Sequence, residues 1–118
     1  MSSAYDEVIK MLSRKGRPTG IIVQGTGVLS STLNAISQLG LRIPEDISLV
    51  SIGRADFILN HVPAISTLRV DYEKLSDEIT ARLFERLGNG NGRKPPLRRL
   101  FPYVLEVRGS STAPPRET

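Results

Sequence analysis

Two spacings of apolar residues alternate along the chain and predict its elements. Between Ser3 and Lys15, apolar residues recur at i, i+3, i+4 and i+7 behind a serine that can cap a helix, and Gly16 can end it. Short β-branched runs bounded by glycine or proline are typical of buried strands. On these criteria helices are expected at 3–15, 28–39 and 71–88, with a short one at 55–60, and strands at 20–24, 47–52, 65–70, 97–101 and 104–107.

The order of these elements predicts the fold class. The strand at 20–24, the helix at 28–39 and the strand at 47–52 form one βαβ unit. A right-handed crossover places both strands in one parallel sheet. The fold class is therefore α/β, with a three-layer architecture in which a mostly parallel sheet is flanked by helices.

Composition narrows the chemistry. The chain has 118 residues, 39% of them hydrophobic, which allows one domain with a modest core. It contains no cysteine, which excludes disulfides, thiolate metal sites and a cysteine nucleophile. His61 is the single histidine and thus the only available base for Ser30, Ser31 or Thr32, and its position between Asn60 and Pro63 suggests a surface loop instead. We predict no catalytic residue, no metal and no cofactor. No run approaches the roughly 18 apolar residues of a membrane span, and no membrane partner is expected.

The charge of the chain is mildly basic, with a net value of +4. Four cations cluster around two prolines: Arg93, Lys94, Arg98 and Arg99. Aromatic side chains that would stack on bases are absent from this cluster, so a solvated loop is favoured over a phosphate-binding patch. The chain by itself does not have the pattern of a DNA-binding module.

Ligands of open parallel sheets bind beyond the carboxyl ends of the strands. Residues 25–27, 53–56 and 70–72 occupy such positions. The run Gly-Thr-Gly-Val-Leu-Ser at 25–30 is close to a dinucleotide fingerprint, and Arg54 follows the second strand, where a 2′-phosphate partner would lie. An NADP-binding half-domain is therefore one alternative, although the acidic ribose partner is absent.

Four motifs in order, over about residues 3 to 112, resemble the bacterial repressors of the lactose/galactose-repressor (LacI/GalR) type. The segment 40–50, Gly-Leu-Arg-Ile-Pro-Glu-Asp-Ile-Ser-Leu-Val, is similar to the family's Gly-Leu-x-Val-Pro-x-Asp-Val-Ser-Val-Val. The lead-in Arg-Pro-Thr-Gly-Ile at 17–21, Pro-Ala-Ile-Ser-Thr-Leu at 63–68 and the closing strand at 102–110 are the other three.

The resemblance implies the C-terminal part of a periplasmic-binding-protein-like sensor domain. Such sensors have two α/β subdomains around an effector cleft and work as cytoplasmic homodimers that bind operator DNA through a separate helix-turn-helix headpiece. The headpiece and nearly all of the first subdomain have no counterpart in this chain. The expected division is 1–112 for the effector-binding and dimerisation domain (3–70, C-terminal subdomain; 71–88, a helix of the first subdomain; 97–108, terminal strands) and 113–118 for a disordered tail. Because the helix at 71–88 would lack its family neighbour, self-association is expected.

The implied effector site departs from the family pattern. Family members commonly carry Asn-Asp at the positions of Gly25 and Thr26. They commonly carry Gly-Phe-Asp-Asp at the positions of residues 51–54, the last two of which here are Gly53 and Arg54. Tyr72 corresponds to the aromatic residue that faces the cleft in family members. Loss of the carboxylate removes an acceptor for sugar hydroxyls, whereas Arg54 can recruit an anion. The predicted effector is therefore sugar-like or anionic, and a site without an effector stays open.

The family's dimer contacts map onto the helix at 28–39 and the segment before the third strand. Leu29, Leu33, Phe57 and Val62 are then the candidates for the dimer interface. The alternative is that these residues fill the core of the monomer. Besides the NADP-binding reading, an extracytoplasmic solute-binding protein and a ligand-free dimerisation remnant are the competing functions.

Overall fold

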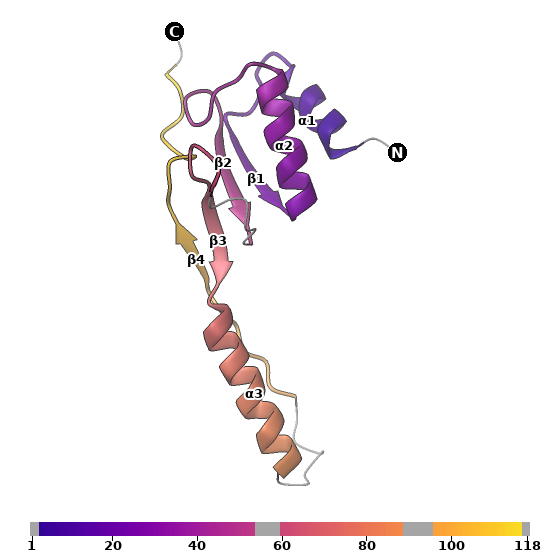
Figure 1. The fold of residues 1–118 in the computed structure, drawn as a ribbon, viewed down its shortest axis with the longest axis vertical. Coiled ribbons are helices and arrows are strands. Elements are labelled where there is room, and N and C mark those ends of the chain that lie inside the picture. Colours follow the sequence, from indigo (N-terminus) through magenta and orange to yellow (C-terminus); the bar gives the residue numbers. More distant parts are fainter. Residues whose placement is uncertain (1–2, 54–59, 89–95, 117–118) are drawn as a thin grey trace. The chain divides into compact units, whose positions relative to one another are not determined.

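A computed structural model describes residues 3–53, 60–88 and 96–116. Within them the chain forms two compact units (Figure 1): a first unit from the N-terminal side to Arg69 together with the residues from Leu105 onward, and a second unit from Val70 to Val104. The elements in chain order are α1 (Ala4–Leu12), β1 (Gly20–Gln24), α2 (Thr26–Gln38), β2 (Ser48–Ile52), β3 (Ser66–Val70), α3 (Tyr72–Gly88) and β4 (Tyr103–Glu106).

The four strands form one sheet in the order β1-β2-β3-β4. β1 pairs with β2, and β2 with β3, both in parallel, which confirms the predicted α/β class. In Figure 1 the arrow of β4 runs opposite to that of β3, so the sheet is mixed. Gln24, Ile52 and Leu68 are register partners, so β1 and β2 end level with each other, and β3 continues two residues further to Val70.

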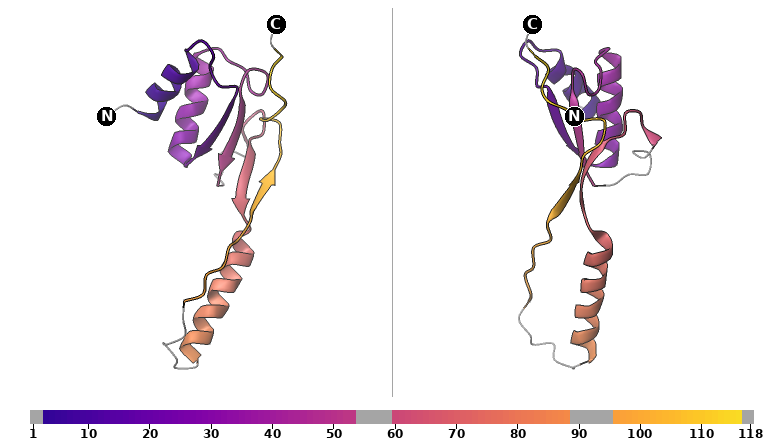
Figure 2. Two further views of the ribbon diagram at one scale, coloured as in Figure 1. Left: turned by 180° about the vertical axis from the view of Figure 1, so that it is seen from behind. Right: turned by 90° about the vertical axis from the view of Figure 1, so that its left-hand side faces the viewer.

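The core of the first unit lies between the sheet and a pair of helices. Val23 and Leu49, on one face of the sheet, pack with Leu29 of α2 and with Ile65. α1 lies beside α2 (Figure 2) and adds a second cluster. Val8, Leu12, Ala35, Ile36 and Ile47 form this second cluster. On the opposite face of the sheet Ile22 is 66% exposed, because the described helices of this unit pack on the other face.

The helix ends follow local hydrogen bonding. Ser3 caps α1 in a capping box: its hydroxyl accepts from the N–H of Asp6, whose carboxylate accepts from the N–H of Ser3. The helix ends at Leu12, three residues before its predicted end, and its C-cap Ser13 donates to the carbonyl of Ile9 from its N–H at 3.0 Å and from its hydroxyl at 2.6 Å. α2 starts at Thr26, two residues before its predicted start.

The closing segment after β4 is held by hydroxyl groups. Ser110 accepts from the N–H of Ser66 at 2.8 Å and donates to the carbonyl of Leu49 at 2.5 Å. The guanidinium of Arg108 donates to the carbonyl of Ile65 at 2.9 Å and to the hydroxyl of Thr67 at 2.8 Å. Arg108 and Ser110, which close the sequence motif at 102–110, therefore tie this segment to β2 and β3.

Two sequence predictions differ from the structure. Residues 97–101 were expected to form a strand but have no regular structure; β4 starts only at Tyr103, because Pro102 cannot donate to a strand ladder. The short helix expected at 55–60 lies outside the described residues, apart from Asn60. None of the described helices is long and apolar enough to cross a membrane.

The second unit consists of α3 and the extended chain at 96–101. Asp71 accepts a hydrogen bond of 3.1 Å from the N–H of Lys74 at the start of the helix, as the sequence predicts for a capping residue. Arg99 donates to the carboxylate of Glu78 at 2.5 Å, and its guanidinium lies 5.6 Å from the ring centre of Phe101. The hydrogen bond from Arg99 to Glu78 attaches the extended chain to one side of α3.

Candidate functional site

The candidate site of the first unit is the carboxyl edge of the parallel sheet, which we define by Gly25, Thr26 and Gly53. Gly25 and Gly53 directly follow the register partners Gln24 and Ile52, so both lie at this edge. The N–H of Gly53 donates to the carbonyl of Leu68 at 2.8 Å, which fixes this turn against β3. The crevice beyond such an edge is where ligands of parallel α/β folds bind.

Both glycines have a backbone reason for their identity. Gly25 has a φ of +103° and Gly53 a φ of +91°, a region that side chains disfavour. A Cβ at Gly53 would meet no atom within 4 Å, and at Gly25 only the side chain of Val28 at 3.9 Å. Both positions therefore have room for a side-chain atom, whereas the backbone geometry opposes the carboxylate or amide that family members carry.

The N-terminus of α2 opens onto this edge. Gly25 is its N-cap and provides no side-chain hydrogen bond, and the first turn contains no acidic residue. The first N–H groups of a helix have no intrahelical acceptor, and the helix dipole makes this end partially positive. Thr26 is exposed in this first turn. The edge can therefore donate hydrogen bonds to an anionic or hydroxyl-bearing ligand.

Arg69 is a charged group near this edge that the sequence analysis did not select. It follows Leu68, the β3 residue in register with Ile52 at the end of β2. Its Nε donates to the carboxylate of Glu106, which also accepts from Arg108. The hydrogen bond from Arg69, reinforced by the charges of both arginines, lowers the pKa of the Glu106 carboxyl below its ordinary value. Its closeness to the edge depends on the register of β2 with β3, so no local sequence pattern could have selected it.

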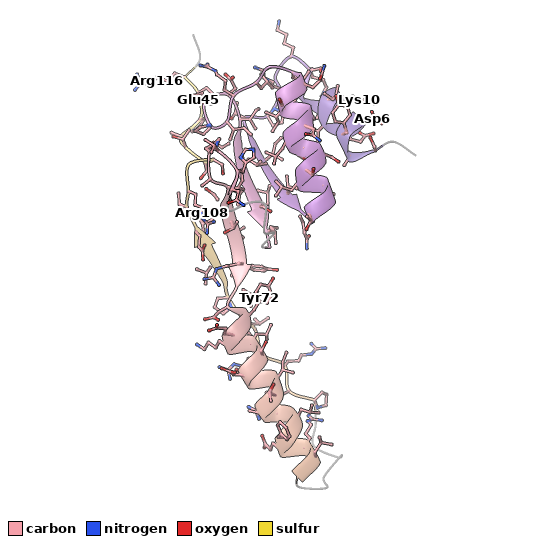
Figure 3. All side chains as sticks on the ribbon, in the orientation of Figure 1. Asp6, Lys10, Glu45, Tyr72, Arg108 and Arg116 are labelled. Atoms are coloured by element: carbon pink, nitrogen blue, oxygen red, sulfur yellow. The ribbon has the colours of Figure 1, made fainter. Side chains whose placement is uncertain are left out.

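The five predicted effector residues are only partly brought together. Gly25, Thr26 and Gly53 share the carboxyl edge. Tyr72 belongs to the second unit, where it starts α3 with 52% of its surface exposed (Figure 3). Arg54 lies outside the described residues.

The predicted dimer residues also divide. Leu29 is 1% exposed and fills the core of the first unit, and Leu33 packs against the same cluster. Both residues therefore fit the alternative interpretation, in which they belong to the core of the monomer. Val62 is 90% exposed and stays available to a partner. Phe57 lies outside the described residues.

The second unit contains a groove of about 580 Å³ between α3 and the extended chain. None of the predicted effector residues lines it. Its apolar lining comes from both segments, and five charged side chains surround it. The lining residues are Leu75, Glu78, Ile79, Arg82, Glu85, Arg86, Pro96, Leu97, Arg99 and Phe101.

The fold defines the class of the protein: an α/β domain in which β1 and β2 run parallel and are each followed by a glycine of positive φ. The profile of the periplasmic binding protein-like domain family matches residues 2–111. The chain belongs to this family. The family resemblance predicted from the sequence motifs is therefore confirmed.

The individual relatives are transcriptional regulators. The HTH-type transcriptional repressor PurR of Yersinia enterocolitica is 27% identical over 115 residues, which cover 98% of this chain and 33% of the repressor. A LacI family transcriptional regulator from Bifidobacterium animalis subsp. lactis superposes with a TM-score of 0.73 at 28% identity, over 97% of this chain and 41% of that chain. A dimeric Lac repressor superposes with a TM-score of 0.75 at 27% identity, over 95% of this chain and 40% of that chain. The chain thus spans about a third of the length of the curated relatives that it matches.

Proposed function

We propose that the chain is the effector-sensing and dimerisation portion of a LacI-type transcriptional regulator. The observation that carries this proposal is the match of residues 2–111 to the periplasmic binding protein-like family, with relatives that are LacI-family regulators. Such a regulator would act in the cytoplasm as a homodimer. Operator DNA would be bound through a helix-turn-helix headpiece outside these residues.

The proposed mechanism is a population shift. An effector that binds better to one arrangement of the sensor raises the population of that arrangement, and the paired DNA-binding segments respond. The shift can be no larger than the difference in the effector's affinity for the two arrangements. Non-catalytic binding is therefore sufficient for the proposed function.

The carboxyl edge supports an anionic effector better than a neutral sugar. At Gly25 and Thr26 it offers the N–H groups of the start of α2 and one hydroxyl, and none of Gly25, Thr26 and Gly53 has a carboxylate that would accept from sugar hydroxyls. A carboxylate or phosphate is an acceptor that complements both the N–H groups and the positive end of α2. Arg54, next to Gly53 in the sequence, adds a positive charge that also favours an anionic ligand.

The test is a binding measurement on the chain with small carboxylates, inorganic phosphate, neutral sugars and purines. Thr26→Glu places a negative charge in the first turn of α2. We expect it to weaken binding of an anion at least tenfold. Thr19→Glu is the matched control: Thr19 is exposed and precedes β1 at the opposite end of the strand, so binding should not change.

Each other outcome selects a competing function. Binding of NADPH that is lost in Arg54→Ala would favour the NADP-binding reading. Saturable binding of a neutral sugar that Thr26→Glu leaves unchanged would favour an effector site of the ordinary sugar-responsive kind. A chain that dimerises tightly and binds none of these compounds would be the ligand-free remnant, and the effector-sensing part of the proposal would be wrong.

A further inference from the structure

The chain passes twice between its two units, and a cluster of charged side chains stands at both passages. The first unit ends at Arg69 and resumes at Leu105, and the second unit is the continuous stretch between them. Arg69 is therefore the last residue before the chain leaves the first unit. Glu106 is the second residue after the chain returns to it.

A closed ring of side-chain hydrogen bonds joins these two passages. The Nε of Arg69 donates to one carboxylate oxygen of Glu106, and the Nη2 of Arg108 donates to the other. The Nη1 of Arg108 donates to the hydroxyl of Thr67 at 2.8 Å and to the carbonyl of Ile65 at 2.9 Å. The ring therefore runs from β3 through Arg108 and Glu106 back to β3.

The alternation of side chains along extended chain explains why these groups meet. Thr67 and Arg69 are two positions apart on β3, so they extend from the same face of the sheet. Glu106 and Arg108 are likewise two positions apart. β4 runs opposite to β3 (Figure 1) and therefore presents its residues in reverse order, which brings Glu106 to Arg69 and Arg108 to Thr67.

Burial of apolar surface does little to hold β4 in place. It stands last in the order of the described strands, beside β3, and none of its residues is buried. Tyr103, Val104 and Leu105 are 58%, 43% and 54% exposed. Segments with few buried apolar contacts are the ones that open locally. The side chains of the ring are better covered than these, and the ring is therefore the contact that can hold β4 on β3.

The charges make Glu106 the member on which the ring depends. Its single carboxylate pairs with two guanidinium groups, those of Arg69 and Arg108. If the carboxylate lost its charge, two like charges would remain on neighbouring segments and repel each other. If Arg69 lost its charge instead, the pair between Glu106 and Arg108 would remain. Removal of the Glu106 charge should therefore be the more disruptive change.

We propose that Arg69, Glu106 and Arg108 form a clamp that holds β4 on β3 where the chain leaves and re-enters the first unit. While the clamp is closed, the two passages move together as a pair of strands. When it opens, β4 separates from β3 and each passage moves by itself. The clamp goes beyond the proposed function, because none of its residues is a predicted effector or dimer residue and it acts without a ligand.

The first experiment follows amide hydrogen exchange of the ligand-free 118-residue chain by NMR. Glu106→Gln keeps the length of the side chain and removes its charge. We expect the protected amides of β4 to exchange at least about fivefold faster in this variant, with those of β1 and β2 within about twofold of the wild type. Arg42→Gln is the matched control, since Arg42 pairs with Asp46 in the same unit outside β3 and β4. It should leave exchange in β4 unchanged.

Two further measurements test the arrangement of charges. The double variant Arg69→Gln/Glu106→Gln removes the repulsion as well as the attraction, so β4 should exchange no faster than in Glu106→Gln alone. In the wild type, about 1 M NaCl screens the attraction and should accelerate exchange in β4. In Glu106→Gln the same salt screens only like charges, so it should slow exchange in β4 or leave it unchanged.

Four results would overturn the clamp. These are a wild type without a protected amide in β4, unchanged exchange of β4 in Glu106→Gln, equal acceleration in β1, β2 and β4, and additive acceleration in the double variant. Equal acceleration would mean that Glu106 contributes to overall stability only. None of these results bears on effector binding at the carboxyl edge. Conversely, a chain that binds no effector but shows the expected exchange pattern would support the clamp and count against the effector-sensing proposal.

Discussion

The hydroxyl of Ser110 accepts a 2.8 Å hydrogen bond from the backbone N–H of Ser66, and neither residue exposes any surface. Because β4 leads into the segment that holds Ser110, this contact fastens the end of the chain to the start of β3. Ser110 also donates to Leu49 in β2, so one side chain satisfies polar groups of two neighbouring strands. A side chain without a hydroxyl would leave both groups buried and unpaired.

Ser110→Ala should lower the free energy of unfolding by about 1–3 kcal/mol, the cost of a buried polar group that loses its partner. Urea unfolding followed by circular dichroism measures this change. Thr112→Ala is the control, because Thr112 is exposed and bonds to Ser48 through its backbone N–H and carbonyl. Equal stability of the Ser110 and Thr112 variants would contradict the assigned role of Ser110.

Glu106 should give the chain an acid-sensitive contribution to stability. Its folded pKa lies below the ordinary 4.5 because Arg69, and with it Arg108, stabilises the ionised carboxylate. A depressed folded pKa stabilises the protein above the unfolded pKa, and this stabilisation is lost as the pH falls through the folded pKa. Wild type should therefore begin to lose its advantage over Glu106→Gln as the pH falls below the ordinary pKa of 4.5, and the loss should be complete once the pH lies below the folded pKa. Urea midpoints that differ by the same amount at pH 7 and pH 3 would argue against this ion pair.

Gly25 and Gly20 should respond differently to the same added methyl group. Gly25→Ala should destabilise the chain by about 1–3 kcal/mol, because its φ of +103° is strained for alanine. Gly20 has no positive φ, and an alanine methyl group there would meet no atom within 4 Å, so Gly20→Ala should be neutral or stabilising by up to about 1 kcal/mol. Thermal unfolding of both variants tests the comparison. A Gly25 variant as stable as the Gly20 variant would mean that the turn can relax.

Leu29 and Val62 were predicted alike but should behave differently when truncated. Leu29→Ala should cost about 2–5 kcal/mol of folding free energy, as for other buried leucines, because it leaves a cavity between α2 and the sheet. Val62→Ala, at a position that is 90% exposed, should stay within about 0.5 kcal/mol of the wild type. Denaturant midpoints at a concentration where the chain is monomeric measure both. A large loss in Val62→Ala would show that this side chain is packed within the monomer.

The sequence predicted most of the fold because its strongest patterns are local. The β-branched runs at 20–24 and 47–52, and the apolar spacing of the helices, correspond to elements whose ends differ by at most three residues from those predicted. The strand expected at 97–101 is absent: Leu97 and Phe101 line the groove beside α3, and Pro102 has no N–H to donate to a strand ladder. Composition alone does not show which neighbour an extended segment finds.

The site was less predictable, for reasons of backbone and register. The positive φ angles of Gly25 and Gly53 arise only when the turns are built, and they explain why glycine stands where the family motif has polar residues. Arg69 escaped notice because its position near the edge depends on the register of β2 with β3. The hydroxyl network of Ser66 and Ser110 joins residues 44 positions apart, which no local pattern reveals.

The most direct test of effector binding at the carboxyl edge is a ¹H–¹⁵N NMR titration of the chain with the panel of carboxylates, phosphate, sugars and purines. We predict that one class of compound produces saturable chemical-shift changes at the backbone amides of Gly25, Thr26 and Gly53, with little change at Gly40 beyond the far end of α2. Shifts confined to amides away from the carboxyl edge, or none with any compound at millimolar concentration, would contradict an effector-sensing role for this edge.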